Sequence, residues 1–298
     1  MSVMDEFSRY HPLVNMTYFV LVLVFGMFFM HPFCLGISLV GGFAYSVYLN
    51  GKSALKFNLK FMLPMLFMTA LINPAFNHEG ATILLYLDNG NPLTLESIIY
   101  GMAAATMLIS IIMWFSCYNK VMTSDKFIYI FGRIIPALSL IFSMVLRFVP
   151  KFKEQIKQIS YAQKCIGRDV SNGGFIDRVK NAIKIMSIMV TWALENSIET
   201  ADSMKSRGYG LKGRTAFSIF RFDNRDKLAM AIILILGMLI VASSRSGLLY
   251  YRYFPTMKGT DFSTKSILSF IEYFMLCITP LVINIGEDWK WKRIQSKI

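Results

Sequence analysis

Three acidic side chains recur at helical spacing in the middle of the chain, where they could form a catalytic cluster. Glu195, Glu199 and Asp202 are followed by Lys205. An interfacial membrane enzyme, such as a prenyl or lipid transferase, would need a carboxylate or histidine cluster of this kind. Oppositely charged residues at this spacing also pair along the surface of a single helix. We favour a solvated or paired helix face, and therefore expect that the chain is not an enzyme.

The histidines and cysteines do not have the spacing of metal ligands. His11, His31 and His78 are far apart, and none lies in an HExxH sequence. The cysteines show no CxxC spacing and are Cys34, Cys117, Cys165 and Cys277. Thiols in apolar runs behave as small buried hydrophobic groups. The phosphate-binding pattern GxxxxGK[ST] is also missing, so we expect no metal, no other cofactor and no ATP site in this chain.

A basic residue ends a long amphipathic pattern. The pattern starts near Phe175 and finishes at Ser206-Arg207-Gly208. Glycine favours the left-handed position that follows a helix, and arginine in the last turn complements the helix dipole, so capping alone could explain the pair. A guanidinium at a helix tip can also bind carboxylates on another protein. An earlier amphipathic pattern also ends at a glycine, Gly167.

Both patterns lie in a polar segment between apolar runs. Residues 150–226 carry an excess of Lys and Arg, which favours the cytoplasmic side of a membrane. We expect N-terminal transmembrane helices in 1–149, a cytoplasmic coupling-helix region in 150–226, and C-terminal transmembrane helices with a basic tail in 227–298. The predicted fold class is all-α: a polytopic membrane helical bundle with a cytoplasmic arm of long amphipathic coupling helices.

The apolar runs predict where the chain crosses the bilayer. The expected spans are a short hairpin of 16–30 and 33–49, then 61–76, 95–117, 228–243 and 266–285. The run 127–149 contains Arg133 and Pro136. A full crossing there would place the basic segment outside the cell, so we expect a tilted or partial helix that returns to the cytoplasmic face.

The composition supports a membrane location. Hydrophobic residues make up 55% of the 298 residues and charged residues 16%, against about 25% charged in soluble domains. The net charge of +13 reports orientation in such a protein, since Lys and Arg stay on the cytoplasmic side. We expect a multi-pass protein of the bacterial cell membrane with a cytoplasmic C-terminus, and no binding of nucleic acid.

A series of motifs resembles a known family. The motifs are Leu146-Arg147-Phe148-Val149-Pro150, Ala162-Gln163-Lys164, Met204-Lys205-Ser206-Arg207-Gly208-Tyr209-Gly210 and Arg214-Thr215. Their order and approximate spacing resemble those in the T component of energy-coupling factor (ECF) transporters. These transporters import vitamins and metal ions. The resemblance covers the polar segment well and the flanking spans loosely.

The resemblance implies a scaffold with docking motifs. In that family two Ala-Arg-Gly motifs on coupling helices dock on two ABC-type ATP-binding subunits, and an S component in the membrane captures the substrate. Ser206, Arg207 and Gly208 match the second motif. Cys165, Ile166 and Gly167 stand at the first, where isoleucine replaces the arginine. Arg168 could serve instead, and an apolar contact through the isoleucine is equally open.

A substrate-binding permease of another class is the main alternative. Such a protein would carry an ionisable residue in the middle of the membrane. Glu272 is the candidate in the apolar runs, but it follows Lys265 by about seven residues, roughly 10 Å along a helix. We therefore expect Glu272 to lie near the membrane interface.

Overall fold

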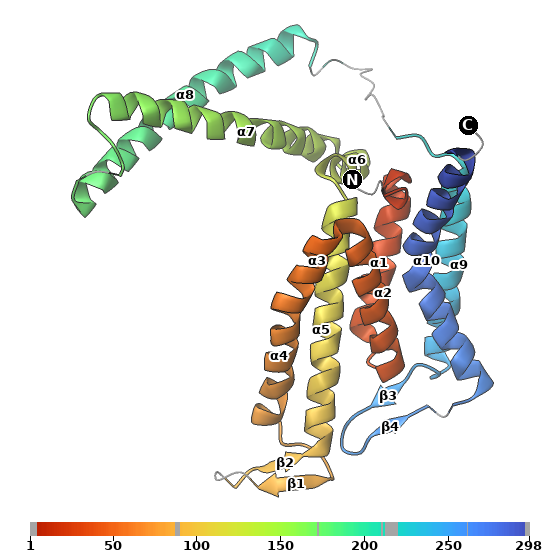
Figure 1. Cartoon of the computed structure of the whole chain (residues 1–298). Helices are drawn as coiled ribbons and strands as arrows, with labels where there is room; N and C mark the ends of the chain where they lie inside the picture. Colours follow the sequence, from red (N-terminus) through yellow and green to blue (C-terminus); the bar gives the residue numbers. More distant parts are fainter. Residues whose placement is uncertain are drawn as a thin grey trace. The chain divides into compact units, whose positions relative to one another are not determined.

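The chain folds almost entirely into helices, in two compact units. The computed structural model describes residues 5–86, 90–171, 173–209, 211, 220–260 and 262–295. Unit 1 comprises Met1–Phe127 with Phe220–Ile298, and unit 2 comprises Ile128–Ile219. The prediction of an all-α fold is confirmed for the described residues, in which only short strands accompany the helices (Figure 1).

Unit 1 is a bundle of long apolar helices. Among the described residues, five continuous helical segments are long and apolar enough to cross a membrane, and the 17-residue α1 is a shorter apolar helix beside them. Their bounds are Pro12–Phe28 (α1), Pro32–Asn50 (α2), Lys52–Phe57 (α3), Leu63–Phe76 (α4), Leu95–Val121 (α5), Asn224–Arg245 (α9) and Thr264–Gln295 (α10). A π-helical turn, Asn58–Met62, joins α3 to α4 without a break. The multi-pass prediction is therefore confirmed.

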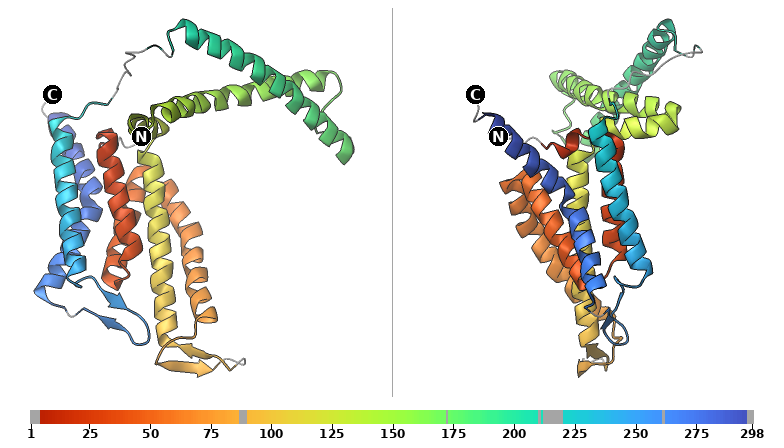
Figure 2. Two further views of the ribbon diagram at one scale, coloured as in Figure 1. Left: turned by 180° about the vertical axis from the view of Figure 1, so that it is seen from behind. Right: turned by 90° about the vertical axis from the view of Figure 1, so that its right-hand side faces the viewer.

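The helices of unit 1 run side by side, as both views in Figure 2 show. Helix α4 packs on α5, α5 on α2, α2 on α10, and α10 on α9. The centre is aromatic, since Tyr18, Tyr45, Trp114 and Tyr273 are almost completely buried. A Cβ atom at Gly101 would lie 2.6 Å from the carbonyl oxygen of Ala70. The small residue therefore allows close packing of α5 against α4 within the bundle.

Two short hairpins meet the α1–α2 turn at one end of unit 1. They consist of Ile83–Tyr86 (β1) with Pro92–Thr94 (β2), and Tyr251–Arg252 (β3) with Lys258–Gly259 (β4). The Tyr253 hydroxyl donates to the carbonyl oxygen of Met30 at 2.7 Å, and the Ala81 amide donates to that of Pro255 at 3.0 Å. The hairpins lie in the connections between the predicted spans 61–76 and 95–117 and between 228–243 and 266–285, where no strand was predicted.

The N-terminal residues tie the helices together at the other end. A short 3-10 helix, Phe7–Arg9 (η1), precedes α1. The Phe7 amide donates to Asn284 Oδ1 of α10 at 2.9 Å, and the His11 amide donates to Asp226 Oδ1 of α9 at 3.0 Å. Lys126 Nζ donates to the carbonyl oxygens of Ser8 and Val121. The chain therefore leaves unit 1 after Phe127 and re-enters it at Phe220 on the same end of the bundle.

Unit 2 contains two long amphipathic helices. They are Pro136–Cys165 (α7) and Phe175–Ser206 (α8). Ile159 of α7 packs in a small apolar cluster with Ile185 and Met189 of α8, and the Phe152 ring meets the Trp192 ring edge-on at 5.7 Å. The second helix has 32 residues, which gives a length of about 48 Å.

The run 127–149 is divided between two helices. Helix α6, Ser124–Ile134, stops before Ile135, and α7 starts at Pro136. Proline disfavours helical geometry in the residue before it, which explains the break. Neither helix is among the candidate spans found in the described residues. The division agrees with the expectation that this run does not cross as one straight helix.

Candidate docking surface at two helix tips

The second tip, Ser206–Tyr209, is a glycine-capped helix end. Gly208 has φ +78°, a left-handed conformation that residues with a side chain rarely adopt. The Gly208 amide donates to the carbonyl oxygen of Lys205 at 2.9 Å, and the Tyr209 amide donates to that of Met204 at 3.0 Å. These two bonds satisfy carbonyls that the helix leaves free at its end. They leave the side chain of Arg207 exposed at the cap position.

The first tip, Cys165–Arg168, has the same backbone. Gly167 also has φ +78°. Its amide donates to the carbonyl oxygen of Lys164 at 3.0 Å, and the Arg168 amide donates to that of Gln163 at 2.9 Å. Ile166 therefore occupies the position that Arg207 has at the second tip. Arg168 occupies the position of Tyr209. Both Cys165 and Ile166 are exposed.

A third glycine cap shows that this backbone conformation is not specific to the two tips. Gly247 has φ +76°, its amide donates to the carbonyl oxygen of Ser244 at 3.0 Å, and the Leu248 amide donates to that of Ser243 at 3.2 Å. This cap ends α9, at the hairpin end of unit 1. The same cap thus occurs away from the two tips. The glycine explains where each helix ends, and any binding specificity must come from the exposed side chains.

The surroundings of the two tips differ in charge. Next to the first tip, Asp169 accepts hydrogen bonds from the hydroxyl and amide of Ser171 at 2.6 and 3.1 Å, and Lys164 Nζ lies 3.3 Å from its carboxylate. These interactions lower the pKa of Asp169 to about 2. At the second tip, Arg207 has no ion pair with any described residue.

The two tips lie at opposite ends of the helix pair (Figure 1). Arg207 lines a groove with Arg147 of α7, whereas the first tip ends α7. The 18 residues from Arg147 to Cys165 correspond to about 27 Å of helix. The structure therefore presents two separate exposed tips and does not join them into one site.

The acidic residues of α8 lie on the exposed surface of the helix. Glu195, Glu199 and Asp202 are exposed, and within the described residues none of them makes an ion pair, including with Lys205. Of the solvated helix face and the paired helix face that we favoured from their spacing, the described residues match the solvated face. The described part of the chain also has no group of three or more His, Cys, Asp or Glu residues that could hold a metal ion.

Glu272 lies near one end of the bundle. It accepts a hydrogen bond from the hydroxyl of Ser243 at 3.1 Å, and Ser243 is two residues from the end of α9 at Arg245. A position near the end of α9 is what an interfacial location requires, and that location of Glu272 stays a prediction.

The comparisons with known proteins agree with this architecture. The family model CbiQ, described as "Cobalt transport protein", matches residues 7–219. An energy-coupling factor transporter transmembrane protein, EcfT, from Lactobacillus helveticus is 34% identical over 106 residues, which are 35% of this chain and 38% of that protein. The EcfT of Lactococcus lactis is 31% identical over 109 residues, 36% of this chain and 41% of that protein. The EcfT of Listeria innocua is 27% identical over 215 residues, 66% of this chain and 80% of that protein.

The fold and the two tips define a class of protein: a polytopic helical membrane protein that carries a pair of long amphipathic helices. The chain belongs to the CbiQ family, whose relatives named above are transmembrane components of energy-coupling factor transporters. The match covers less than half the length of the Lactobacillus and Lactococcus relatives.

Proposed function

We propose that the chain is the membrane scaffold of an ECF-type importer. It couples ATP hydrolysis by two ABC-type ATP-binding subunits to the uptake of a vitamin or metal ion that a separate S component captures. The observation that carries this proposal is the pair of exposed, glycine-capped tips on amphipathic helices, in a family whose relatives bear the name of that transporter. The chain itself performs no catalysis and binds no cofactor.

Each tip docks on one ATP-binding subunit. At the second tip, Arg207 offers a planar set of five donors to a carboxylate of the partner. At the first tip, the exposed Ile166 makes an apolar contact or Arg168 supplies the cation. The separation of about 27 Å along α7 supports two docking contacts on two subunits, since one small surface could not reach both tips.

The end of unit 1 that connects to unit 2 is cytoplasmic. Lys126, Arg225 and the basic C-terminal turn of α10, with Lys292 and Arg293, lie at this end. Lys and Arg flanking membrane helices stay predominantly on the cytoplasmic side. The six apolar helices found in the described part of the chain, an even number of crossings, also return it to the side from which it started. Unit 2 and the C-terminus are therefore cytoplasmic in this proposal.

A natural thiol tests both the sidedness and the docking. Cys165 is exposed at the first tip, and the other three cysteines are buried. A membrane-impermeant maleimide should label Cys165 in inside-out vesicles and not in intact cells. Co-expression of the ATP-binding subunits should slow that labelling, because docking covers the tip. Cys165→Ser is the control that identifies the labelled site.

Two outcomes would contradict the proposal. Labelling of Cys165 in intact cells would place unit 2 outside the cell. An unchanged labelling rate in a complex that contains both ATP-binding subunits would remove the first tip from the interface. A permease that binds substrate itself should instead bind that substrate when purified alone, whereas the proposed scaffold should bind it only together with an S component.

A further inference from the structure

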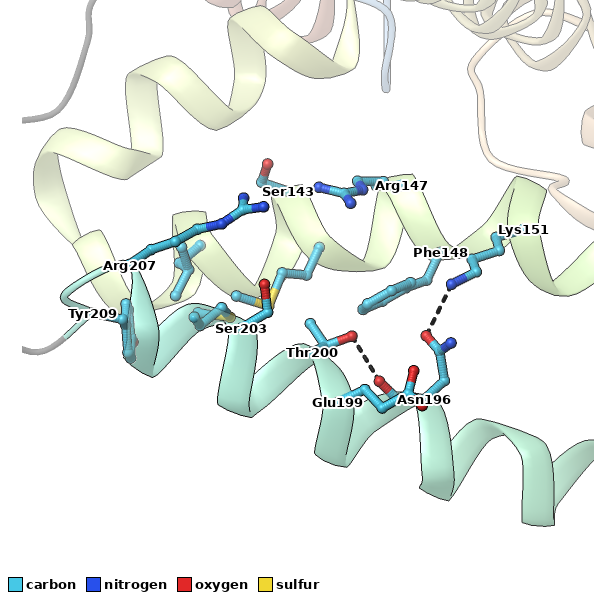
Figure 3. Close-up of a pocket in the computed structure, with 13 residues that line it drawn as sticks. Ser143, Arg147, Phe148, Lys151, Asn196, Glu199, Thr200, Ser203, Arg207 and Tyr209 are labelled. Atoms are coloured by element: carbon cyan, nitrogen blue, oxygen red, sulfur yellow. Dashed lines mark hydrogen bonds between the residues drawn. The ribbon is translucent and has the colours of Figure 1, made fainter.

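A groove lies between α7 and α8 beside the second tip. Its volume is about 420 Å³, within the range of roughly 300–1,000 Å³ that small-molecule sites occupy. The groove forms where the two helices diverge from their apolar contact at Phe152 and Trp192. Figure 3 shows its lining side chains, which come from both helices. The polar ones used in the following argument are Ser143, Arg147, Lys151, Glu199, Ser203 and Arg207.

The groove has an excess of positive charge. Arg147 and Arg207 extend toward one another from the two helices (Figure 3). Within the described residues, neither guanidinium makes a hydrogen bond or an ion pair. Lys151 Nζ donates to Asn196 Oδ1 at 3.0 Å, and Glu199 is the one acidic residue that lines the described groove. Two cations directed at one another repel, and a bound anion would offset this repulsion.

The donors suit a phosphate group. Two guanidiniums can each give two parallel hydrogen bonds to phosphate oxygens, and such charge-assisted bonds are stronger than neutral ones. The hydroxyls of Ser143 and Ser203 line the same groove and can donate to further oxygens. Four apolar side chains also line the groove, Leu140, Met144, Phe148 and Met204, beside the polar Asn196, Thr200 and Tyr209. An amphipathic molecule with a phosphate head therefore matches both parts of the groove.

The outer surface of α7 indicates the source of that phosphate. Around Arg147, this helix exposes several large apolar side chains, which are Ile141, Phe142, Val145, Leu146 and Val149. Lysines follow at 151 and 153. A helix with an exposed apolar face and adjoining basic residues lies in the membrane interface, where its cations meet anionic lipid headgroups.

We propose that the groove binds the phosphate group of an anionic phospholipid, through Arg147 and Arg207 with Lys151 at its edge. The bound lipid holds the second end of the helix pair at the membrane surface. This role goes beyond docking on an ATP-binding subunit, and it places Arg207 where the lipid and the docking partner meet. Arg147 has no part in the docking contact and belongs to the lipid site alone.

Lipid retention by the full-length purified chain tests this proposal. The chain alone, in mild detergent, is titrated with phosphatidylglycerol or phosphatidylcholine, and bound lipids are counted by native mass spectrometry. We expect tighter binding of phosphatidylglycerol. Arg147→Gln should weaken that binding about fivefold, the effect of one cation near an anionic membrane. Lys184→Gln is the matched control, because Lys184 is an exposed lysine of α8 that does not line the groove.

Soluble phosphate is the second arm of the test. Glycerol 3-phosphate, added at the same concentration, should not displace the lipid, because it lacks the apolar part. Equal phosphatidylglycerol binding by the wild type and Arg147→Gln would overturn the proposal, and so would full displacement by glycerol 3-phosphate. No ATP-binding subunit is present in this measurement, so its outcome does not depend on the proposed docking function.

Discussion

The first and second tips share a backbone and differ in the side chains that it presents. Both use a left-handed glycine and the same two reverse hydrogen bonds. The cap position holds Ile166 at the first tip and Arg207 at the second, and the next position after the glycine holds Arg168 and Tyr209. A local backbone rule therefore fixes the shape of each tip, while the sequence at two positions sets its chemistry. The same cap after α9 shows that this backbone geometry can end a helix that carries no docking motif.

The tips also differ in how their charge is balanced. Arg168 is followed directly by Asp169, whose carboxylate is held by Ser171 and Lys164. Arg207 faces Arg147 across the groove, and Glu199 is the acid that lines the described groove. Lys164, Arg168 and Asp169 therefore leave one positive charge at the first tip. Arg147, Lys151 and Arg207 with Glu199 leave two in the groove at the second tip. If both dock on similar ATP-binding subunits, the second should contribute most of the charge-dependent affinity.

The largest predicted effect is at the second tip. Arg207→Glu replaces a cation by an anion where we propose that a carboxylate of the partner lies. Breaking one side of a buried charged pair costs about 2–5 kcal/mol, so copurification of the ATP-binding subunits and uptake should be lost. Arg207→Ala should weaken both in the same direction. Membrane insertion should be unchanged, because the arginine side chain is exposed and makes no ion pair within the described residues.

Lys184→Glu is the control for that charge reversal. It places the same charge change on the exposed surface of α8, about six helical turns before Arg207, and should leave docking at the second tip unchanged. An undiminished yield of complex with Arg207→Glu would show that the second tip is not a docking site. The first tip would then be the remaining candidate docking site of the two.

Much of the helical architecture can be predicted from the sequence. The stripe of apolar residues predicts a helix from about Phe175 to Arg207, and α8 runs from Phe175 to Ser206. Hydropathy is less informative at helix ends. Helix α10 continues to Gln295, although the apolar run ends near Ile285. Backbone hydrogen bonds continue past the apolar segment, so the end of hydrophobicity does not end the helix.

The two hairpins and the groove depend on contacts between distant residues. A hydrogen bond from the Tyr253 hydroxyl to the carbonyl oxygen of Met30 holds the β3–β4 hairpin. The local sequence has no alternation of apolar and polar residues that would predict these strands. The groove exists because Phe152 and Trp192 set the crossing of α7 and α8, which brings Arg147 to Arg207. The spacing of glycines predicts both helix ends, and the motif comparison already places Ile166 at the position of Arg207. The structure adds that both residues occupy the cap position of the same glycine cap.

The next prediction concerns the first tip. Ile166→Arg restores a cation at the position that matches Arg207, and we expect it to be tolerated or to strengthen assembly by up to about tenfold, the range of one hydrogen bond to a charged group. Arg168→Ala should weaken assembly less than Arg207→Ala, because the exposed Ile166 remains as a contact at the first tip. Both are measured as the yield of ATP-binding subunits with the tagged chain. Loss of the complex with Ile166→Arg would show instead that the isoleucine is itself a docking contact.

Two glycine caps allow the effect of the cap on stability to be separated from its effect on docking. Gly208→Ala and Gly247→Ala each force a side chain into a left-handed conformation, which costs about 1–2 kcal/mol. Both should lower the thermal unfolding temperature of the purified chain by a similar amount. Only Gly208→Ala should also reduce copurification, because it moves Arg207. Equal effects of the two variants on copurification would mean that the second tip matters for stability and not for docking.

The smallest predicted effect concerns the charge beside the first tip. The lowered pKa of Asp169, about 2 against the usual 3.8, means that its ionised form stabilises the turn. That contribution is fully present above about pH 4 and is lost as the pH falls toward 2. Hydrogen exchange at the Ser171 amide should therefore show no pH-dependent loss of protection between pH 8 and 5, after correction for intrinsic rates.

Asp169→Asn tests the same contribution without acid. The amide can still accept from Ser171, but it loses the attraction of Lys164, so exchange at Ser171 should rise only about twofold, as expected for an exposed pair. The variant also leaves Arg168 without its neighbouring anion. If the carboxylate of Asp169 limits the affinity of the first tip, copurification should increase slightly. A loss of protection in the wild-type turn between pH 7 and 5 would show that the carboxylate is not held as the structure has it.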